Sequence, residues 1–534
     1  MPDISDLTLV APLAALAAAA LTVIVVDLLA PARFSRSWVL VTAIAGVLLA
    51  AWYVWDLWTR VTGLPGFAAG ELRPFGGAVA VDRLSLIAGL LILGAALVAL
   101  LLSVTERARD MSGYVSLMLF AALGMMVLAA AADTMVLFVA LETFSLSLYA
   151  LVAFRRWEQA AREGAFKYFL LGSVAGGLLL YGFALIYGVT GTTKLAAVAE
   201  LARGGALGPM YHVGFALAVI GFAFKLALAP FHAWAPDAYQ GAPTPVTAFM
   251  AVGTKAAAFV AMARFLWAAV PADATVAQAY LAPIGVLACV SMLVGSLGAV
   301  FQTNLKRLMA YSGIAHAGYL FLPMMTLRPE GLAQAVFYLF AYLCMAGGAF
   351  AVMAARAAGE GDEAETPAGA DLDELGDWRG LYRRRPGLAL LMALFFLAMA
   401  GVPPTAGFTG KLLLISGGLT AGAGWLLAAM VASTGISAYV YLRVVSTLFR
   451  APEDDAAEAS AADHGSTVQP AARPSPAGAV GIVPAPAGGL GPVTIAWDRV
   501  AVGLALLLTA AGLLVLGLFP QAVLNGLQGM LPLR

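Results

Sequence analysis

The chain contains fourteen apolar runs of membrane-spanning length, and this repetition restricts the fold more than any other feature. About 20 apolar residues match the hydrocarbon thickness of a bilayer. The runs lie at roughly 8–29, 38–58, 83–104, 113–131, 133–154, 164–189, 210–229, 244–269, 279–301, 307–326, 331–355, 386–419, 424–449 and 498–519. Only 11% of residues are charged and 62% are hydrophobic, whereas soluble domains carry about 25% charged residues. The sequence therefore predicts an all-α polytopic membrane protein.

Two of the predicted helices are interrupted by prolines. Residues 222–246 read FAFKLALAPFHAWAPDAYQGAPTPV, and the twelfth run contains Gly401, Pro403, Pro404 and Gly407. A broken helix is tolerated in a bilayer only where protein or a water-filled cavity satisfies the freed backbone groups. Helices 7 and 12 are therefore predicted to be discontinuous.

The two breaks occupy equivalent places in two blocks of five helices, helices 4 to 8 and 9 to 13. Paired interruptions of this kind are typical of transporters built from inverted repeats. Because each block has an odd number of helices, the second must enter the membrane from the opposite side. The predicted domains are a three-helix segment (1–112), a first repeat (113–269), a second repeat (279–449) with an acidic loop (357–385), a disordered linker (450–497) and a last helix (498–534).

The basic residues predict the orientation. Most lie in loops that follow odd-numbered helices, so the positive-inside rule places those loops, and the linker, on the cytoplasmic side. Both termini should then lie outside the cytoplasm. The first run has Asp3 and Asp6 before it and no basic residue, which favours an uncleaved helix over a signal peptide.

Several function classes are disfavoured by composition. The formal net charge is zero, which argues against a nucleic-acid partner. Cys289 and Cys344 lie in separate apolar runs and match neither a disulfide framework nor an iron–sulfur or metal motif. There is also no nucleotide-binding glycine motif. We therefore expect no cofactor or metal in this chain, and any redox cofactor should belong to another subunit.

Lysine and arginine are used differently. Arginine dominates the loops, whereas Lys167, Lys225, Lys255 and Lys411 lie within apolar runs. A desolvated lysine can lose its proton, but arginine stays charged, so lysine is the residue type that a proton relay needs. The alternative is that the side chains snorkel toward the membrane surface, which fits Lys167 near a helix end.

Glu142 is the one carboxylate deep within a central run, and a lysine on a neighbouring helix could hold it ionised. At about 4 Å and an effective dielectric constant of about 20, such a pair interacts by roughly 4 kcal/mol. Making or breaking it could switch a lysine between holding and releasing a proton; a purely structural salt bridge is the alternative. His316 could relay protons, because its unperturbed pKa is near neutral, or could be a core histidine.

Five segments carry a resemblance to a known family: LETFSLSLYALVAF, KYFLLGS, FKLALAPFHAWAPDAYQGAPTPVTAF, RLMAYSGIAHAGY and GVPPTAGFTGK. They resemble signatures of the antiporter-like subunits of proton-pumping NADH:quinone oxidoreductase, respiratory complex I. The wording YQGAPTPV is similar to subunit N rather than to its L and M paralogues. The resemblance implies fourteen helices, inverted repeats and broken helices 7 and 12.

The resemblance also implies roles for the buried residues. Glu142 matches a helix 5 glutamate that pairs with Lys225 on helix 7. Lys255 matches a central connecting lysine, His316 a central-axis histidine and Lys411 a helix 12 lysine that opens toward the exit side. Lys167 matches the lysine of helix 6.

The implied function is proton translocation across the bacterial inner membrane, driven by quinone reduction elsewhere in the complex. The partners would be other membrane-arm subunits and the lipid bilayer, with flavin and iron–sulfur clusters held by partner subunits. One alternative is a subunit of a cation/proton antiporter or a membrane-bound hydrogenase. A second, from a different class, is a structural membrane scaffold whose charges only fix helix packing.

Overall fold

The computed structural model describes residues 6–31, 35–62, 72–106, 108, 110–204, 207–359, 373–451 and 492–527. Within those ranges the regular secondary structure is helical, with isolated β-bridges and no β-strand. Eleven helices there are long and apolar enough to cross a membrane. The predicted fold class, an all-α polytopic membrane protein, is confirmed.

The helices follow the predicted runs closely. Before the second repeat they are α2 (Ala11–Leu29), α3 (Ser35–Thr62), α5 (Arg83–Leu102), α6 (Met111–Ala130), α7 (Thr134–Val152), α8 (Gln159–Thr190), α10 (Pro209–Lys225), α11 (Trp234–Gly241), α12 (Thr244–Phe249) and α13 (Lys255–Ala269). From there on they are α14 (Ala274–Val300), α15 (Leu305–Tyr319), α16 (Pro329–Gly359), α18 (Pro386–Ala400), α19 (Ala406–Thr420), α20 (Gly424–Phe449) and α22 (Pro492–Leu518).

Short helices join or flank these spans. They are α1 (Asp6–Leu9), α4 (Pro74–Gly77), α9 (Leu195–Arg203), α17 (Leu381–Arg384) and α23 (Pro520–Leu527). The two predicted breaks are present, between α10 and α11 and between α18 and α19. The eleven long spans, these two discontinuous helices and α15 account for the fourteen predicted runs.

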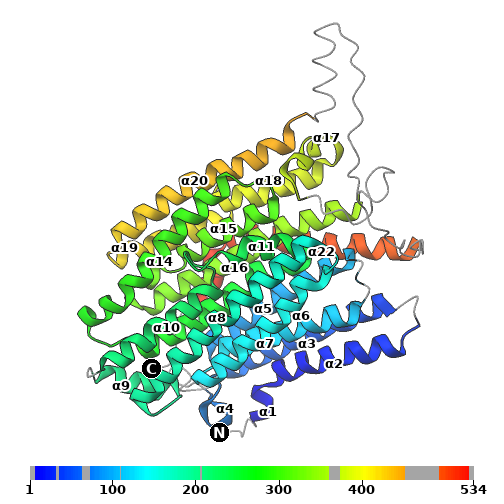
Figure 1. Ribbon diagram of the computed structural model, residues 1–534. Coiled ribbons are helices and arrows are strands. Elements are labelled where there is room, and N and C mark those ends of the chain that lie inside the picture. The colour runs from blue at the N-terminus through cyan, green and yellow to red at the C-terminus, as the bar shows by residue number, and fades with distance from the viewer. Residues whose placement is uncertain are drawn as a thin grey trace.

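The two five-helix repeats share a pattern of neighbours. In the first repeat α6 packs on α7 and α13, and α8 packs on α10. In the second, α14 packs on α15 and α20, and α16 packs on α18. Figure 1 shows the helices running side by side, with α2 and α3 at one edge of the bundle and α20 at the opposite edge. The last helix, α22, packs against α5, α16 and α19.

The predicted hydrophilic segments are only partly described. Residues 360–372 of the acidic loop and 452–491 of the linker lie outside the described residues. The end of the acidic loop packs on the protein, because Trp378 is buried and Asp373 forms an ion pair with Lys306 at 3.0 Å. This part of the loop is therefore docked, which the sequence did not suggest.

Candidate functional site

The first break is a tight turn that closes its own hydrogen bonds. After α10, Ala227 has a left-handed backbone with φ 55°. The Leu228 N–H donates to the Ala223 carbonyl at 2.8 Å, and the Ala227 N–H donates to the Phe224 carbonyl at 3.0 Å. This pair of bonds is the Schellman motif that ends many helices. The turn leaves Lys225 in the last helical turn, facing the bundle interior.

Side chains satisfy further backbone groups at this break. The Trp234 indole N–H donates to the Phe224 carbonyl at 3.1 Å, and the Ala229 N–H donates to the Ser291 hydroxyl at 2.8 Å. Ser291 lies on α14, so the second repeat supports the break in the first. Protein groups thus replace water at the interruption, as a broken helix in a bilayer requires.

The second break uses the same turn. The Val402 N–H donates to the Leu397 carbonyl at 3.1 Å, and the Gly401 N–H donates to the Ala398 carbonyl at 3.0 Å. Here the left-handed residue is a glycine, Gly401, with φ 94°. Glycine adopts this conformation without the steric cost that a Cβ brings.

Lys411, on α19, reaches back across the second break. Its buried ammonium donates to the carbonyls of Met399 and Ala400 at 2.8 and 3.0 Å, and lies 5.8 Å from the centre of the Tyr319 ring. These carbonyls belong to the last turn of α18, where backbone acceptors lack partners within the helix. Lys411 is therefore also the cap of α18.

Lys225 is held by hydroxyl groups instead. Lys225 is only 3% exposed. Its ammonium donates to the Ser145 hydroxyl at 2.7 Å and to the Tyr149 hydroxyl at 3.2 Å, and both residues are on α7. Four aromatic rings surround the ammonium with centroids 5.4–5.8 Å away: Phe144, Tyr149, Tyr168 and Phe224. A hydroxyl both donates and accepts, so these two partners are able to exchange a proton with the lysine.

Glu142 lies on the same face of α7 as Ser145 and Tyr149, because helix residues three or four apart are neighbours. Its Oε1 is buried without a hydrogen-bond partner and faces Gly176 on α8, where an added Cβ would lie 2.6 Å from it. No ion pair within 4.0 Å joins Glu142 to Lys225, both of which are among the described residues. The Lys225 ammonium donates to the two hydroxyls instead, so a direct ion pair between Glu142 and Lys225 stays a prediction.

Lys255 stands at an irregular point of its span. The five residues before it, Met250–Thr254, form a π-helical turn, a rare element that is frequent at functional sites. Its buried ammonium donates to the Tyr239 hydroxyl at 3.0 Å and to the Ala251 carbonyl at 3.3 Å. The centre of the Tyr342 ring is 5.8 Å away.

His316 lies within a cluster of tyrosines. Nε2 is 3.0 Å from the Tyr441 hydroxyl and Nδ1 is 2.7 Å from the Tyr338 hydroxyl. A neutral imidazole donates through one nitrogen and accepts through the other, so both contacts can be hydrogen bonds at once. The imidazole centre lies 5.0 Å from the Tyr342 ring and 5.3 Å from the Tyr319 ring.

These contacts bring three of the predicted residues into one buried series. Tyr342 neighbours both Lys255 and His316, and Tyr319 neighbours both His316 and Lys411. Lys225 and Glu142 form a second group around α7, and no hydrogen bond or ion pair among the described residues joins either of them directly to Lys255. Sequence reasoning named the charged residues of the series but missed the tyrosines between them.

Lys167 lies apart from both groups. Its side chain is 41% exposed and forms ion pairs with Glu163 at 2.5 Å and with Asp237 at 2.7 Å. Asp237 also pairs with Arg307 on α15. The network joins α8, α11 and α15 near the surface, where ion pairs contribute little stability.

Three cations, two of them fully buried, have contacts that the sequence did not predict. Lys306, at the start of α15, is fully buried and forms an ion pair with Asp373. Arg264 on α13 donates to both oxygens of Asp82, at 2.5 and 2.7 Å, and to the Ala129 carbonyl at 2.7 Å. Arg443 on α20 donates to the carbonyls of Val300 and Gln302 at 2.6 and 2.7 Å. The arginine of each fifth helix thus binds carbonyls at the end of its repeat's first helix.

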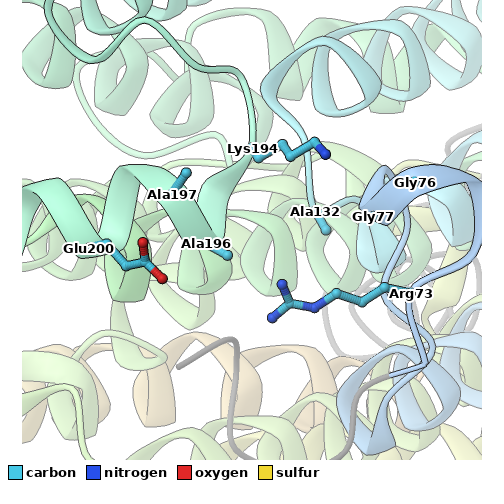
Figure 2. A pocket seen from close by; sticks show the side chains of 8 residues that line it. All are labelled: Arg73, Gly76, Gly77, Ala132, Lys194, Ala196, Ala197 and Glu200. Carbon is cyan, nitrogen blue, oxygen red and sulfur yellow. The ribbon is translucent and has the colours of Figure 1, made fainter.

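A pocket of about 390 Å³ contains none of these buried residues. Its lining residues are Arg73, Gly76, Gly77, Ala132, Lys194, Ala196, Ala197 and Glu200, as Figure 2 shows. The described residues hold no group of three or more His, Cys, Asp or Glu side chains placed to bind a metal ion. The buried lysine groups and this pocket are therefore separate places in the fold.

The repeats, the paired breaks and the buried lysines define an antiporter-like membrane subunit. Residues 131–437 match the family described as NADH:quinone oxidoreductase/Mrp antiporter, TM. NADH-quinone oxidoreductase subunit N 1 of Symbiobacterium thermophilum is 47% identical over 461 residues, covering 84% of this chain and 89% of the relative. Subunit N of Trichlorobacter lovleyi is 42% identical over 410 residues, covering 74% and 82%. The chain belongs to the NADH-quinone oxidoreductase subunit N family.

Solved structures agree with this assignment. A chain of respiratory complex I from Thermus thermophilus superposes with a TM-score of 0.72 at 35% identity, covering 97% of this chain and 99% of that one. A chain of the Mrp complex from Dietzia sp. superposes with a TM-score of 0.72 at 22% identity, covering 98% of each. The second likeness shows a shared fold.

Proposed function

We propose that this chain is a membrane-arm subunit of a bacterial NADH–quinone oxidoreductase and translocates protons, driven by quinone reduction elsewhere in the complex. The observation that carries the proposal is the buried series from Lys255 through His316 to Lys411, which reaches the second helix break, in a chain of the subunit N family. Buried ionisable residues in a membrane protein mark ion paths, because each must repay a large desolvation penalty.

In this proposal Glu142 and Lys225 form the first half-site. With the ammonium on the Ser145 and Tyr149 hydroxyls, as here, the lysine and the carboxylate are not in direct contact. Movement of either side chain into contact would favour the protonated lysine by roughly 4 kcal/mol at an effective dielectric constant of about 20. Alternation between the two arrangements would load and release a proton.

Lys255 then connects the half-sites, His316 relays within the second repeat, and Lys411 leads to the exit. Lys167, in its exposed ion pairs, is assigned to the surface network rather than to the path. We further propose that the chain spans the inner membrane with both termini outside the cytoplasm. Its partner subunits would hold the flavin and the iron–sulfur clusters, and this chain would hold no redox centre.

The proposal is tested by Lys225→Ala and Glu142→Ala in the intact complex. Each variant should assemble, yet translocate fewer protons per NADH oxidised in sealed vesicles. Lys194→Ala, which removes an exposed lysine at the pocket of Figure 2, is the matched control and should translocate normally. Full translocation by both Lys225→Ala and Glu142→Ala would refute the assignment and support a scaffold role.

The fold shared with a chain of the Mrp complex favours one alternative function, that of a subunit of a cation/proton antiporter. Purification of the chain with its native partners separates the two. A complex that carries flavin and oxidises NADH supports the proposal, whereas sodium-dependent proton exchange without redox cofactors supports the rival.

A further inference from the structure

Lys306, in the first turn of α15, joins three parts of the fold. Its ammonium donates to the Ala242 carbonyl at 3.3 Å and forms an ion pair with Asp373 at 3.0 Å. Ala242 is the residue at which α11 ends, in the first repeat, and Asp373 lies in the docked end of the acidic loop, in the second. Lys306 is fully buried. One cation, shielded from water, therefore connects α11 to α15 and to the loop.

The Lys306 ammonium caps α11. The last carbonyls of a helix lack partners within it, and a cation at that end is favoured by the helix dipole. Because α11 has eight residues, its own hydrogen bonds hold it weakly and its position depends on its neighbours. It packs on α8 and α15. Lys306 is thus one of the groups that decide where the last turn of α11 lies.

The short helix α11 carries the hydroxyl partner of the central lysine. Tyr239, three residues before Ala242, is 2% exposed and accepts from the Lys255 ammonium at 3.0 Å. The Thr247 hydroxyl donates to the Tyr239 carbonyl at 3.0 Å, so this turn is also tied to the start of the next helix, α12. A shift of the last turn of α11 would therefore move the Tyr239 hydroxyl relative to Lys255.

The acidic loop is fixed beside Lys306 by its backbone. The Leu305 N–H donates to the Asp373 carbonyl at 2.6 Å. Two residues further on, the Leu375 N–H donates to the Thr303 carbonyl at 2.7 Å. Asp373 is thus held through its backbone as well as through its carboxylate, and it gives Lys306 a fixed counter-charge.

A second cation of α15 binds α11 nearer the surface. Arg307 donates to the Asp237 carboxylate, and to the Gln240 side chain at 3.1 Å. The side chains of Arg307 and Asp237 are 28% and 21% exposed, so water and salt screen this pair more than they screen the buried Lys306. Lys306 is therefore the less screened of these two links between the helices.

We infer that Lys306 is a positioning residue for Lys255. By capping α11 it keeps the Tyr239 hydroxyl on the Lys255 ammonium, and Asp373 keeps Lys306 in place. This role rests on the proposed function, in which Lys255 connects the two half-sites. Lys306 itself carries no proton; it fixes one of the two hydrogen bonds that hold the Lys255 ammonium. A misplacement of about 1 Å at such a partner can cost roughly 100-fold in rate.

Two double variants test this role in the intact complex: Lys306→Met/Asp373→Asn and Lys306→Met/Asp373→Leu. Both remove the cap and leave no buried charge without its partner, and replacement of a buried ion pair by uncharged residues of similar volume is often tolerated. Each should assemble and lose several-fold in protons translocated per NADH oxidised. Lys194→Met, the same substitution at an exposed lysine, is the control and should be unchanged.

Tyr239→Phe separates positioning from a general loss of packing. It keeps the ring and removes the hydroxyl that Lys306 positions, so it should lower the proton yield by itself. Adding Lys306→Met/Asp373→Asn to it should not lower the yield further, because both changes act on one hydrogen bond. A merely structural Lys306 would instead change the thermal midpoint and leave the proton yield of the assembled complex at the parent value.

Parent-level proton yield in either double variant or in Tyr239→Phe, or an additive loss in the triple variant, would overturn the inference. Failure of both double variants to assemble would also overturn it, because the ion pair would then be needed to fold the chain rather than to position Tyr239.

Lys255→Ala, measured in parallel, tests the proposed function separately. If Lys255→Ala lowers the proton yield while the two double variants do not, the role of Lys306 is wrong and the proposed function stands. If Lys255→Ala translocates normally, the proposed function itself fails.

Discussion

The two helix breaks have the same backbone conformation and differ in the position of their lysine relative to the break. Both end the first half-helix with the same pair of hydrogen bonds and a left-handed residue, Ala227 in one and Gly401 in the other. Lys225 precedes its break and bonds to side-chain hydroxyls across the bundle. Lys411 follows its break and bonds to the carbonyls of the half-helix before it.

In the proposed path this difference would separate a lysine that exchanges protons from one that also supports a helix end. Hydroxyls donate and accept, so Lys225 can pass a proton to its partners without breaking the helix end. Backbone carbonyls only accept, so the charge of Lys411 also stabilises the end of α18. The repeats are therefore equivalent in fold but not in how tightly each lysine is bound to the backbone.

The arginines on the fifth helix of each repeat, α13 and α20, also have similar positions but different partners. Arg264 and Arg443 both bind carbonyls at the end of a first helix, but Arg264 also binds the buried carboxylate of Asp82. Arg264→Leu should therefore destabilise the protein by about 3–5 kcal/mol, because it leaves a buried charge without its partner. Arg443→Leu should cost less.

The difference in stability between the two leucine variants can be measured from the thermal midpoint of the purified complex. Equal losses would mean that the Asp82 pair adds nothing and that the two arginines are equivalent. Arg264→Leu/Asp82→Asn, which removes the stranded charge, should recover part of the loss.

Substitution of the two lysines at the breaks should give the second-largest difference in stability. Lys411→Met removes the partner of two carbonyls, at about 1–3 kcal/mol for each acceptor left unsatisfied. Lys225→Met removes a buried charge whose hydroxyl partners can reorient, so its effect on the thermal midpoint should be smaller. A larger loss for Lys225→Met would show that Lys411 is not the cap of α18.

Substitution of the two left-handed residues, Gly401 and Ala227, should give the smallest difference in stability. Gly401→Ala forces a Cβ into a left-handed backbone and to within 3.1 Å of Lys411 Cδ, which should destabilise the break by about 1–3 kcal/mol. Ala227→Gly removes such a Cβ and should change stability by less than about 1 kcal/mol. Protease sensitivity at each break would report the ranking, and the reverse order would contradict the shared-turn description.

Much of this architecture could be predicted because hydropathy and proline placement act along the chain. The spans, both breaks and the burial of Lys225, Lys255 and Lys411 all follow from residues within about one helix length of each other. Lys255 was recognised as buried, but the π-helical turn before it was not, since no proline or glycine pair at 250–254 signals that turn.

What could not be predicted depends on which helices are neighbours. Tyrosine reads as part of an apolar run, so Tyr342 gave no sign that its hydroxyl faces Lys255 from another helix. The same limit applies to Glu142: its helix was identified correctly, but the hydroxyls of Ser145 and Tyr149 take Lys225 instead of the carboxylate. The ion pair of Lys306 could not be predicted, because its partner, Asp373, is far away in sequence.

The most direct test of the account is the number of protons translocated per NADH oxidised by the intact complex carrying Lys255→Ala. Lys255 is the lysine at the junction of the two repeats, and its contacts lead through Tyr342 to His316. The account predicts an assembled, NADH-oxidising complex whose proton yield falls clearly below that of the parent and of Lys194→Ala. A yield equal to the parent's would contradict a proton path through this subunit.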